Sequence, residues 1–307
     1  MVSVIIPLYN KERTISNTIE SVLNQSYKDF ELIIVNDGST DRSINAVEKF
    51  KDDRIRIINK SNGGVSSARN RGIMEAKSEW IAFLDGDDYW EPSFLSTLID
   101  LKARYPDAGL YTGQYAQVNN AKEIIRLDRF PLIDEGYFDL FSYIYAVHSS
   151  SILVNKHVFD ICGFFDENLT HGEDTDMWIR IGLKFKLCYT NSLISYYNTG
   201  GNPLSRSIGK FPPFNKRFLS KIDNYLIEGN DEWNYFLLNI KAKGLKQYIK
   251  RYPFNKEFQD RINELPYDIR KQHGLLKIEI KRYILLIKLA LFEYPKNILK
   301  KIVYKFK

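Results

Sequence analysis

The stretch of sequence that decides the fold is Trp80–Asp88, WIAFLDGDD. Four consecutive apolar residues follow Trp80, and a short apolar run of this kind is typical of a parallel strand buried on both faces. In open α/β sheets, ligands bind beyond the carboxyl ends of such strands. Three carboxylates, those of Asp85, Asp87 and Asp88, follow this strand and repel one another unless a positive charge lies among them.

Two interpretations of this acidic end are open. Mg²⁺ and Mn²⁺ prefer hard oxygen ligands and commonly bridge protein carboxylates to phosphates, so the cluster predicts a divalent cation shared with a phosphate-bearing substrate. Alternatively, the carboxylates form an acidic turn that caps the helix opened by Pro92. The rest of the chain shifts the balance between the two.

Strand and helix patterns alternate along the first part of the chain. The apolar spacing predicts strands over residues 2–8, 30–35, 55–58, 80–84 and 108–118, and helices over 12–25, through 46–50, over 66–76 and from 92 to 105. Further along, it predicts a strand over 149–154, a helix from 171 to 183, and two short strands over 187–189 and 194–197. This alternation with short connections predicts a doubly wound α/β sheet with mostly parallel strands.

Polar loops follow several of these strands and are expected to converge on one edge of the sheet. They contain Tyr9 and Asn10, Asn36 and Asp37, and Asp85–Asp88. No G-x-G-x-x-G follows the first strand and no P-loop lysine motif occurs, so a nucleotide is expected to be held by side chains and a metal.

Composition places the chain among cytoplasmic proteins. Cys162 and Cys188 form no CxxC pair, so they give neither a metal signature nor a disulfide framework, and a reducing compartment is expected. Met1–Pro7 has the pattern of a strand rather than of a signal peptide, and no run approaches the ~18 apolar residues of a membrane span. The expected location is the cytoplasm, with peripheral contact on the inner face of the plasma membrane as an option.

Six motifs in order resemble those of family 2 glycosyltransferases. They are Ser3–Asn10, Val35–Asp41, Gly63–Asn70, Leu84–Asp88, Gly172–Asp174 and Asn202–Ser205. The resemblance implies a GT-A fold, a Rossmann-like, doubly wound mixed sheet. It also implies inverting transfer of a sugar from a nucleotide diphosphate donor, here a UDP-sugar, to a glycan or polyprenyl-linked acceptor, with Mn²⁺ or Mg²⁺ as cofactor.

The same resemblance implies roles on the donor side of the site. Pro7, Tyr9 and Asp37 would hold the nucleobase, with Asp37 accepting from the base N–H. Arg69 would lie near the base or the diphosphate. The remaining donor-side roles are ribose or sugar binding for Asp85, metal binding for Asp87, and a supporting or sugar-contacting role for Asp88.

On the acceptor side, the resemblance makes Asp174 the catalytic base, with Glu173 beside it. An acceptor hydroxyl is a poor nucleophile, so a carboxylate has to take its proton as the new bond forms. The leaving diphosphate gathers charge, which a metal and nearby cations neutralise. A plainer interpretation is also open, because acidic residues in a first helical turn are favoured by the helix dipole.

One departure from the family pattern affects the metal. Relatives often carry a basic residue and a His just before the Gly-Gly-Asn-x-Ser loop, where this chain has Tyr197–Gly200 with Thr199. Arg206, or a lysine of the tail, is expected to replace the missing positive group.

The last hundred residues differ in charge from the rest. Of the 44 basic and 38 acidic residues, 22 and 10 fall in 208–307, so this part has a net charge of +12 and residues 1–207 one of −6. The sequence therefore predicts a catalytic domain over 1–207 and a basic, mostly helical extension over 208–307, with helices over 232–252, 258–269 and 274–292.

The helix expected after Pro295 is basic and amphipathic. It either lies on an anionic membrane or packs on the catalytic domain or on a second copy of the chain. No nucleic-acid partner is expected, because the first domain is acidic and no recognition motif occurs.

Two other functional classes remain as alternatives. One is a non-catalytic nucleotide-sugar-binding or scaffold protein of a polysaccharide assembly complex, against which the intact Asp85, Asp87 and Asp174 argue. The other is a nucleotidyltransferase, whose glycine- and lysine-rich phosphate loop is absent from the sequence.

Overall fold

The computed structural model describes residues 1–119, 121–127, 135–138, 147–199, 216–251, 256–273 and 275. The chain forms two compact units, 1–210 and 211–307, each taken by itself below. Arg206, the Asn202–Ser205 motif and the basic helix expected after Pro295 lie outside the described residues, so their roles stay predictions.

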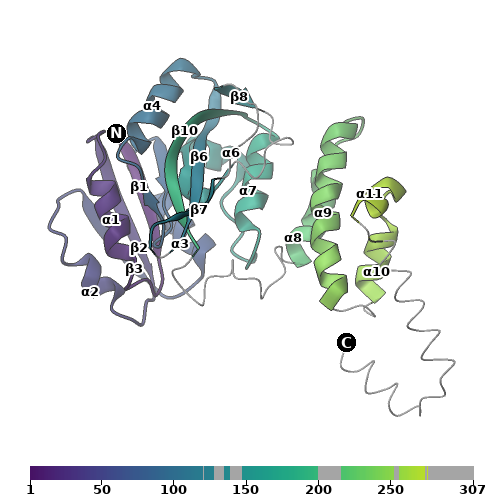
Figure 1. The fold of residues 1–307 in the computed structure, drawn as a ribbon, viewed down its shortest axis with the longest axis horizontal. Helices are drawn as coiled ribbons and strands as arrows, with labels where there is room; N and C mark the ends of the chain where they lie inside the picture. The colour runs from purple at the N-terminus through teal and green to yellow at the C-terminus, as the bar shows by residue number, and fades with distance from the viewer. Residues whose placement is uncertain are drawn as a thin grey trace, which may run out of the picture. The chain divides into compact units, whose positions relative to one another are not determined.

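Among the described residues, a sheet of ten strands forms the centre of the first unit (Figure 1). The strands are β1 Val2–Leu8, β2 Phe30–Asp37, β3 Ile55–Lys60, β4 Trp80–Phe83, β5 Tyr89–Trp90, β6 Ala108–Val118, β7 Ile124–Leu127, β8 Gly136–Phe138, β9 Ile152–Asn155 and β10 Lys186–Asn198. Their order is β3-β2-β1-β4-β9-β6-β10-β5, with β7 paired to β6 and β8 to β10.

The sheet is mixed. Strands β3, β2, β1 and β4 run parallel, whereas β9 is antiparallel to both β4 and β6. Because the chain moves outward from β1 to β2 and β3 and then returns to β4 on the other side of β1, a switch in strand order falls between β1 and β4. Such switch points are where open α/β sheets bind ligands.

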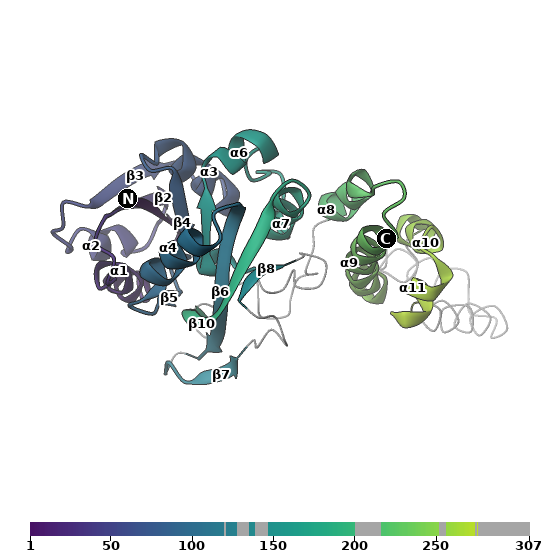
Figure 2. The same cartoon turned by 90° about the horizontal axis from the view of Figure 1, so that it is seen from above.

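Helices cover both faces of this sheet (Figure 2). One face carries α1 Ile15–Leu23, α2 Ser43–Val47 and α4 Phe94–Arg104, and the other carries α3 Val65–Glu75, α6 His157–Cys162 and α7 Glu173–Gly182. The predicted doubly wound arrangement is therefore confirmed.

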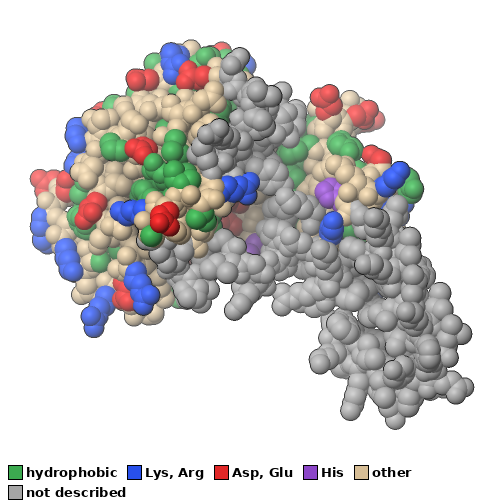
Figure 3. Space-filling view, viewed as in Figure 1, with side chains coloured by type: hydrophobic (Ala, Val, Ile, Leu, Met, Phe, Trp, Pro, Cys, Tyr) green, Lys and Arg blue, Asp and Glu red, His purple; other side chains and the backbone are tan. Residues whose placement is uncertain are grey.

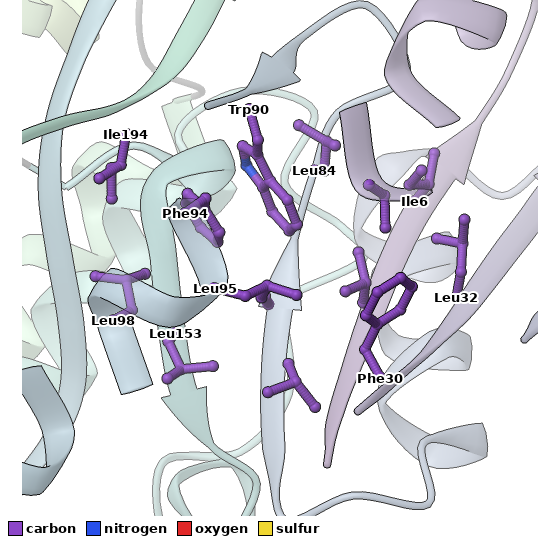
Figure 4. Packing of buried hydrophobic residues seen from close by; sticks show 14 of the residues in the cluster. Ile6, Phe30, Leu32, Leu84, Trp90, Phe94, Leu95, Leu98, Leu153 and Ile194 are labelled. Carbon is purple, nitrogen blue, oxygen red and sulfur yellow. The ribbon is translucent and has the colours of Figure 1, made fainter. Parts of the chain in front are cut away.

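Burial on both faces of the sheet explains why the central strands are largely apolar along their length. Alternate residues of β1, among them Ile6 and Leu8, join a buried cluster with α1 and α4, in which Trp90 stacks on Phe94 at 3.8 Å between ring centroids (Figure 4). Ile5 faces α3, so β1 is buried on both sides. Burying each such side chain contributes roughly 1.5–3 kcal/mol.

Two predictions for the second half of this unit are wrong. The segments 187–189 and 194–197 belong to one strand, β10, whose register against β6 shifts around Leu193. The residues at this irregularity are polar, so the sequence pattern there is typical of a turn between two strands, although the strand continues.

The predicted strand over 149–154 starts later than expected. Ser149–Ser151 form a 3-10 turn, η2, and only Ile152–Asn155 are in the sheet. His148 caps this turn, because its side chain accepts a hydrogen bond from the backbone N–H of Ser150.

The second unit is helical where it is described. It contains α8 Lys216–Lys221, the 3-10 turn η3 Ile222–Tyr225, α9 Asp231–Arg251, α10 Lys256–Asn263 and α11 Tyr267–Gln272. The single helix predicted over 258–269 is two helices, because Pro266 takes an extended conformation and caps α11. Trp233 is buried and donates from its indole N–H to the carbonyl of Tyr225 at 2.7 Å.

Within the part of the chain that the structure describes, no helix is long and apolar enough to span a bilayer. Cys162 and Cys188 are free thiols. On the visible face of the first unit, basic and acidic side chains are interspersed (Figure 3).

Candidate active site at the carboxyl edge of the sheet

The strand-end loops converge on one edge of the sheet, as predicted. Asn10, after β1, accepts a hydrogen bond from the N–H of Thr40, after β2, at 2.8 Å. Lys11 in turn forms an ion pair with Asp87, after β4. The convergence is confirmed by these contacts between segments that lie 30 and 76 residues apart in sequence.

Asp37 ends β2 and organises the glycine turn that follows β3. Its carboxylate accepts hydrogen bonds from the N–H groups of Gly63 and Gly64, at 2.9 and 2.8 Å, and from Nζ of Lys60 at 2.6 Å. The side chain is buried. Asp37 thus lies beside this turn, and its contact with a nucleobase N–H stays a prediction.

Pro7 and Tyr9 lie at the same edge. Pro7 pairs with Val35 one residue before the end of β1, and its carbonyl oxygen lies beside Gly86. Tyr9 follows the strand and is 44% exposed, which leaves its ring available for a ligand.

Arg69 on α3 connects two acidic parts of the site. Its Nη2 donates to Oδ1 of Asp85 at 2.8 Å, and its Nη1 lies 3.5 Å from Oε1 of Glu173. The guanidinium is buried and lies over the ring of Phe165. Although burial raises the pKa of Asp85, the charge of Arg69 and weaker effects of His148 and Lys11 bring that pKa below its ordinary value.

Two glycines set the position of Arg69. Gly64 caps α3 with a φ of +88°, a conformation that favours glycine. A Cβ on Gly72 would lie 2.4 Å from Cγ2 of Ile5, so only glycine lets α3 approach β1 this closely. The motif Gly63–Asn70 thus places its arginine beside the end of β4.

Glu173 and Asp174 lie in the first turn of α7. Gly172 precedes them in the left-handed conformation, with a φ of +78°. Burial and the neighbouring charge of Asp174 raise the pKa of Glu173 to about 7, against the opposing effect of Arg69. Oδ1 of Asp174 accepts from the N–H of Thr175 at 2.6 Å, whereas Oδ2 accepts no hydrogen bond within the described residues.

Asn70, the last residue of the Gly63–Asn70 motif, fixes the segment leading to α7. Its amide donates to the carbonyl of Phe165 at 2.9 Å and accepts from the N–H of the same residue at 2.9 Å. The partners lie 95 residues apart, so a single sequence gave no signal of this contact.

Asp88 is buried beneath the site and connects three of its segments. Its carboxylate accepts from the Ser150 hydroxyl at 2.6 Å and from the N–H of Asn198 at 3.0 Å, and the same hydroxyl accepts from the N–H of Asp85 at 3.1 Å. Burial and the charges of Asp87 and Asp85 raise the pKa of Asp88 well above its ordinary value. Asp88 therefore joins the acidic loop to η2 and to the end of β10.

His148 is a site residue that sequence reasoning missed. Asp85, Asp174 and Asp87 exert electrostatic effects on its ring, but burial prevails and lowers its pKa. The ring lies 5.0 Å from that of Tyr115 and 4.8 Å from that of Tyr197, between centroids.

Comparison with known proteins identifies the family. Residues 3–165, more than half of the chain, match the family described as "Glycosyl transferase family 2". The chain belongs to glycosyl transferase family 2. An uncharacterized glycosyltransferase of Rickettsia typhi is 28% identical over 295 residues, which cover 88% of this chain and 92% of the relative.

A second relative carries a specific name. The UDP-Glc:alpha-D-GlcNAc-diphosphoundecaprenol beta-1,3-glucosyltransferase WfaP of Escherichia coli is 33% identical over 208 residues, 67% of this chain and 80% of WfaP. Among solved structures, residues 1–349 of TarS from Staphylococcus aureus, in complex with UDP-GlcNAc, match with a TM-score of 0.69 at 20% identity. That match covers 94% of this chain and 91% of the TarS chain. The predicted family, the GT-A fold and the glycosyltransferase class are confirmed.

The family implies a divalent cation. Whether such a cation fits depends on which side chains near Asp87 could be its ligands. Within the described residues, no group of three or more His, Cys, Asp and Glu side chains is placed to hold a metal ion. Mg²⁺ commonly binds through one or two carboxylates together with substrate phosphates and waters. The described residues therefore fit a cation that Asp87 shares with a bound diphosphate, and they offer no set of three protein ligands that would hold one tightly without it.

Two further features bear on that cation. Lys11 pairs with the Asp87 carboxylate, so its charge occupies the place where a cation would bind. The hydroxyl of Thr199 donates to the carbonyl of Val118 at 3.0 Å, so this side chain serves the end of β10.

Proposed function

We propose that this glycosyltransferase moves a sugar from a UDP-sugar to a hydroxyl of a growing cell-surface glycan by a single displacement that inverts the anomeric carbon. The observation that carries the proposal is the position of Arg69, which pairs with Asp85 from the strand edge and with Glu173 from the start of α7. Arg69 thereby holds Asp85, proposed to bind the donor, close to the first turn of α7, which carries the proposed base.

Asp174 is the proposed base. Its Oδ1 is engaged by the N–H of Thr175, which fixes the carboxylate, and Oδ2 is left without a hydrogen bond among the described residues. In the proposed step, Asp174 takes the proton of the acceptor hydroxyl while the oxygen bonds to the anomeric carbon. The bond from that carbon to the diphosphate breaks at the same time, so UDP leaves with its electron pair.

Residues of the sheet edge bind the donor in this proposal. Pro7, Tyr9 and Asp37 hold the uracil, and Asp85 binds the ribose or the sugar. Asp87 would hold Mn²⁺ or Mg²⁺ together with the diphosphate, and a cation there supplies neutralisation of the leaving charge. Arg206 is proposed, from sequence alone, as a further positive group.

The named relatives support the donor and acceptor classes. WfaP is named for a UDP-glucose donor and a diphosphoundecaprenol-linked acceptor, and the TarS structure contains UDP-GlcNAc. We therefore propose a hexosyl or N-acetylhexosaminyl transfer to a polyprenyl-linked glycan. A lipid-linked acceptor also gives a reason for the basic sequence after Pro295, as a contact with an anionic membrane.

The test combines donor binding with transfer. Thermal shift with UDP-glucose and UDP-GlcNAc, with and without Mn²⁺, measures binding, and release of UDP in the presence of a polyprenyl-diphosphate acceptor measures turnover. Asp174→Asn is expected to keep donor binding and lose transfer, whereas Asp160→Asn, an exposed acid on α6, is expected to keep both.

Two outcomes would contradict the proposal. Full activity of Asp174→Asn would remove this residue as the base. Donor binding without turnover on any lipid-linked acceptor, in the unaltered chain, would favour the non-catalytic scaffold protein.

A further inference from the structure

His148 is held in a defined orientation. Its Nδ1 accepts the N–H of Ser150 at 3.2 Å, and its backbone N–H and carbonyl both bond the Ser151 hydroxyl, at 3.3 and 2.9 Å. Tyr115 from β6 and Tyr197 from β10 pack against the ring. Residues from η2 and from two strands therefore fix the position of the imidazole.

These contacts also determine where the ring carries its proton. A nitrogen that accepts a hydrogen bond has no proton, so the neutral ring is protonated on Nε2. Within the described residues, Nε2 takes part in no hydrogen bond, and it is not among the fully buried polar atoms that lack a partner. His148 therefore presents an accessible N–H donor that no described protein group uses.

Several charged residues of the site act on the His148 ring. Asp85 and Asp174 exert the strongest electrostatic effects on it, followed by Arg69 and Asp87. Contacts place the ring at the same edge, because Ser150, whose N–H bonds the ring, accepts the N–H of Asp85 through its hydroxyl at 3.1 Å. Because burial keeps its pKa low, His148 is neutral at neutral pH.

We propose that His148 contacts the transferred sugar, donating from Nε2–H to a hydroxyl oxygen of that sugar. This inference rests on the proposed function. A neutral N–H suits the oxygen of a neutral hydroxyl, whereas phosphate oxygens favour cations such as Lys11 and Arg69, which are present at the same edge. His148 would then recognise the sugar part of the donor and not the nucleotide part.

The test separates the two parts of the donor. Isothermal titration with UDP, UDP-glucose and UDP-GlcNAc compares the unaltered chain with His148→Phe, which keeps a ring but no donor, and with His148→Gln, whose amide N–H reaches the place of Nε2. His157→Phe is the matched control, because His157 is exposed on α6. Melting temperatures confirm that each variant folds.

We expect His148→Phe to bind the preferred UDP-sugar about tenfold more weakly, to bind UDP with unchanged affinity, and to lose at least as much in transfer rate. His148→Gln should recover most of both losses. Equal weakening for UDP and for the UDP-sugar would overturn the inference, as would unchanged binding and transfer in His148→Phe. A chain that binds no UDP-sugar even without substitution overturns the proposed function itself, which is a separate result.

Discussion

Arg69 donates from Nη2 to Oδ1 of Asp85 at 2.8 Å, with its guanidinium only 3% exposed. The same group lies 3.5 Å from Glu173, so one buried cation serves two carboxylates. Removing one partner of a buried ion pair leaves an uncompensated charge, which is far more costly than losing an exposed pair.

Arg69→Met is therefore expected to lower the free energy of unfolding by about 3 kcal/mol or more. Arg71→Met is the matched control on the same helix, since Arg71 is 48% exposed and pairs with the half-exposed Glu75. It should cost less than about 1 kcal/mol. Urea unfolding at neutral pH measures both values, and similar losses for the two variants would contradict the assigned role of Arg69.

The raised pKa of Glu173 predicts a pH dependence of stability. A carboxyl group whose pKa rises from 4.5 in the unfolded chain to about 7 in the folded chain holds its proton more tightly when folded. Its stabilising contribution is complete below the unfolded value and is lost as the pH rises through the folded value. This group alone lowers the free energy of unfolding by up to about 1.4 kcal/mol per pH unit in that window.

Urea unfolding between pH 5 and pH 8 checks this prediction. Glu173→Gln keeps the shape of the side chain but cannot titrate, so its stability should fall less steeply with pH than that of the unaltered chain. Glu48→Gln, at an exposed position, should keep the original slope. Parallel slopes for Glu173→Gln and the unaltered chain would show that Glu173 titrates normally.

Asp88 and Ser150 form a buried pair whose contribution can be measured as a coupling. Asp88→Ala leaves the Ser150 hydroxyl and the N–H of Asn198 without their acceptor, and unsatisfied buried groups cost about 1–3 kcal/mol each. Asp88→Asn should cost less, because its carbonyl oxygen can still accept from Asn198.

A double-mutant cycle with Ser150→Ala tests the pair directly. The combined loss of Asp88→Ala and Ser150→Ala should be smaller than the sum of the single losses by at least about 0.5 kcal/mol. Additive losses would mean that the two side chains do not support each other.

Much of the fold followed from the sequence, because β1, β2 and β4 are largely apolar runs that end in polar loops. The same pattern placed Asp37 and Asp85 at one edge. The contacts of Asn70 and Ser150 were not predictable, since their partners lie 95 and 62 residues away. A single chain carries no signal of such distant pairs.

His148 was not predicted as a site residue for a different reason. The sequence predicts a strand over 149–154, and the position just before a strand gives no indication of a functional role. The polar run His148–Ser151 is instead a capped turn, with the His side chain satisfying a backbone N–H. A histidine three residues before a serine, at the start of an apolar segment, is a pattern that would have suggested this turn.

The Lys11–Asp87 ion pair predicts how the chain responds to a divalent cation. Lys11 is 20% and Asp87 12% exposed in their side chains, and the stem of Lys11 packs on Gly86, where a Cβ would lie 3.3 Å from its Cγ. A cation that binds Asp87 has to displace this ammonium group. Lys11→Met should therefore bind Mn²⁺ up to about tenfold more tightly in the absence of nucleotide.

Electron paramagnetic resonance of free Mn²⁺, titrated with protein alone, measures this affinity without relying on turnover. Lys60→Met is the matched control, because Lys60 pairs with Asp37 and not with Asp87. Its Mn²⁺ affinity should equal that of the unaltered chain, and Asp87→Ala should abolish the gain in the Lys11→Met background. If Lys11→Met binds Mn²⁺ no better than the unaltered chain, the lysine does not compete with the cation, and Asp87 is not its ligand in the nucleotide-free protein.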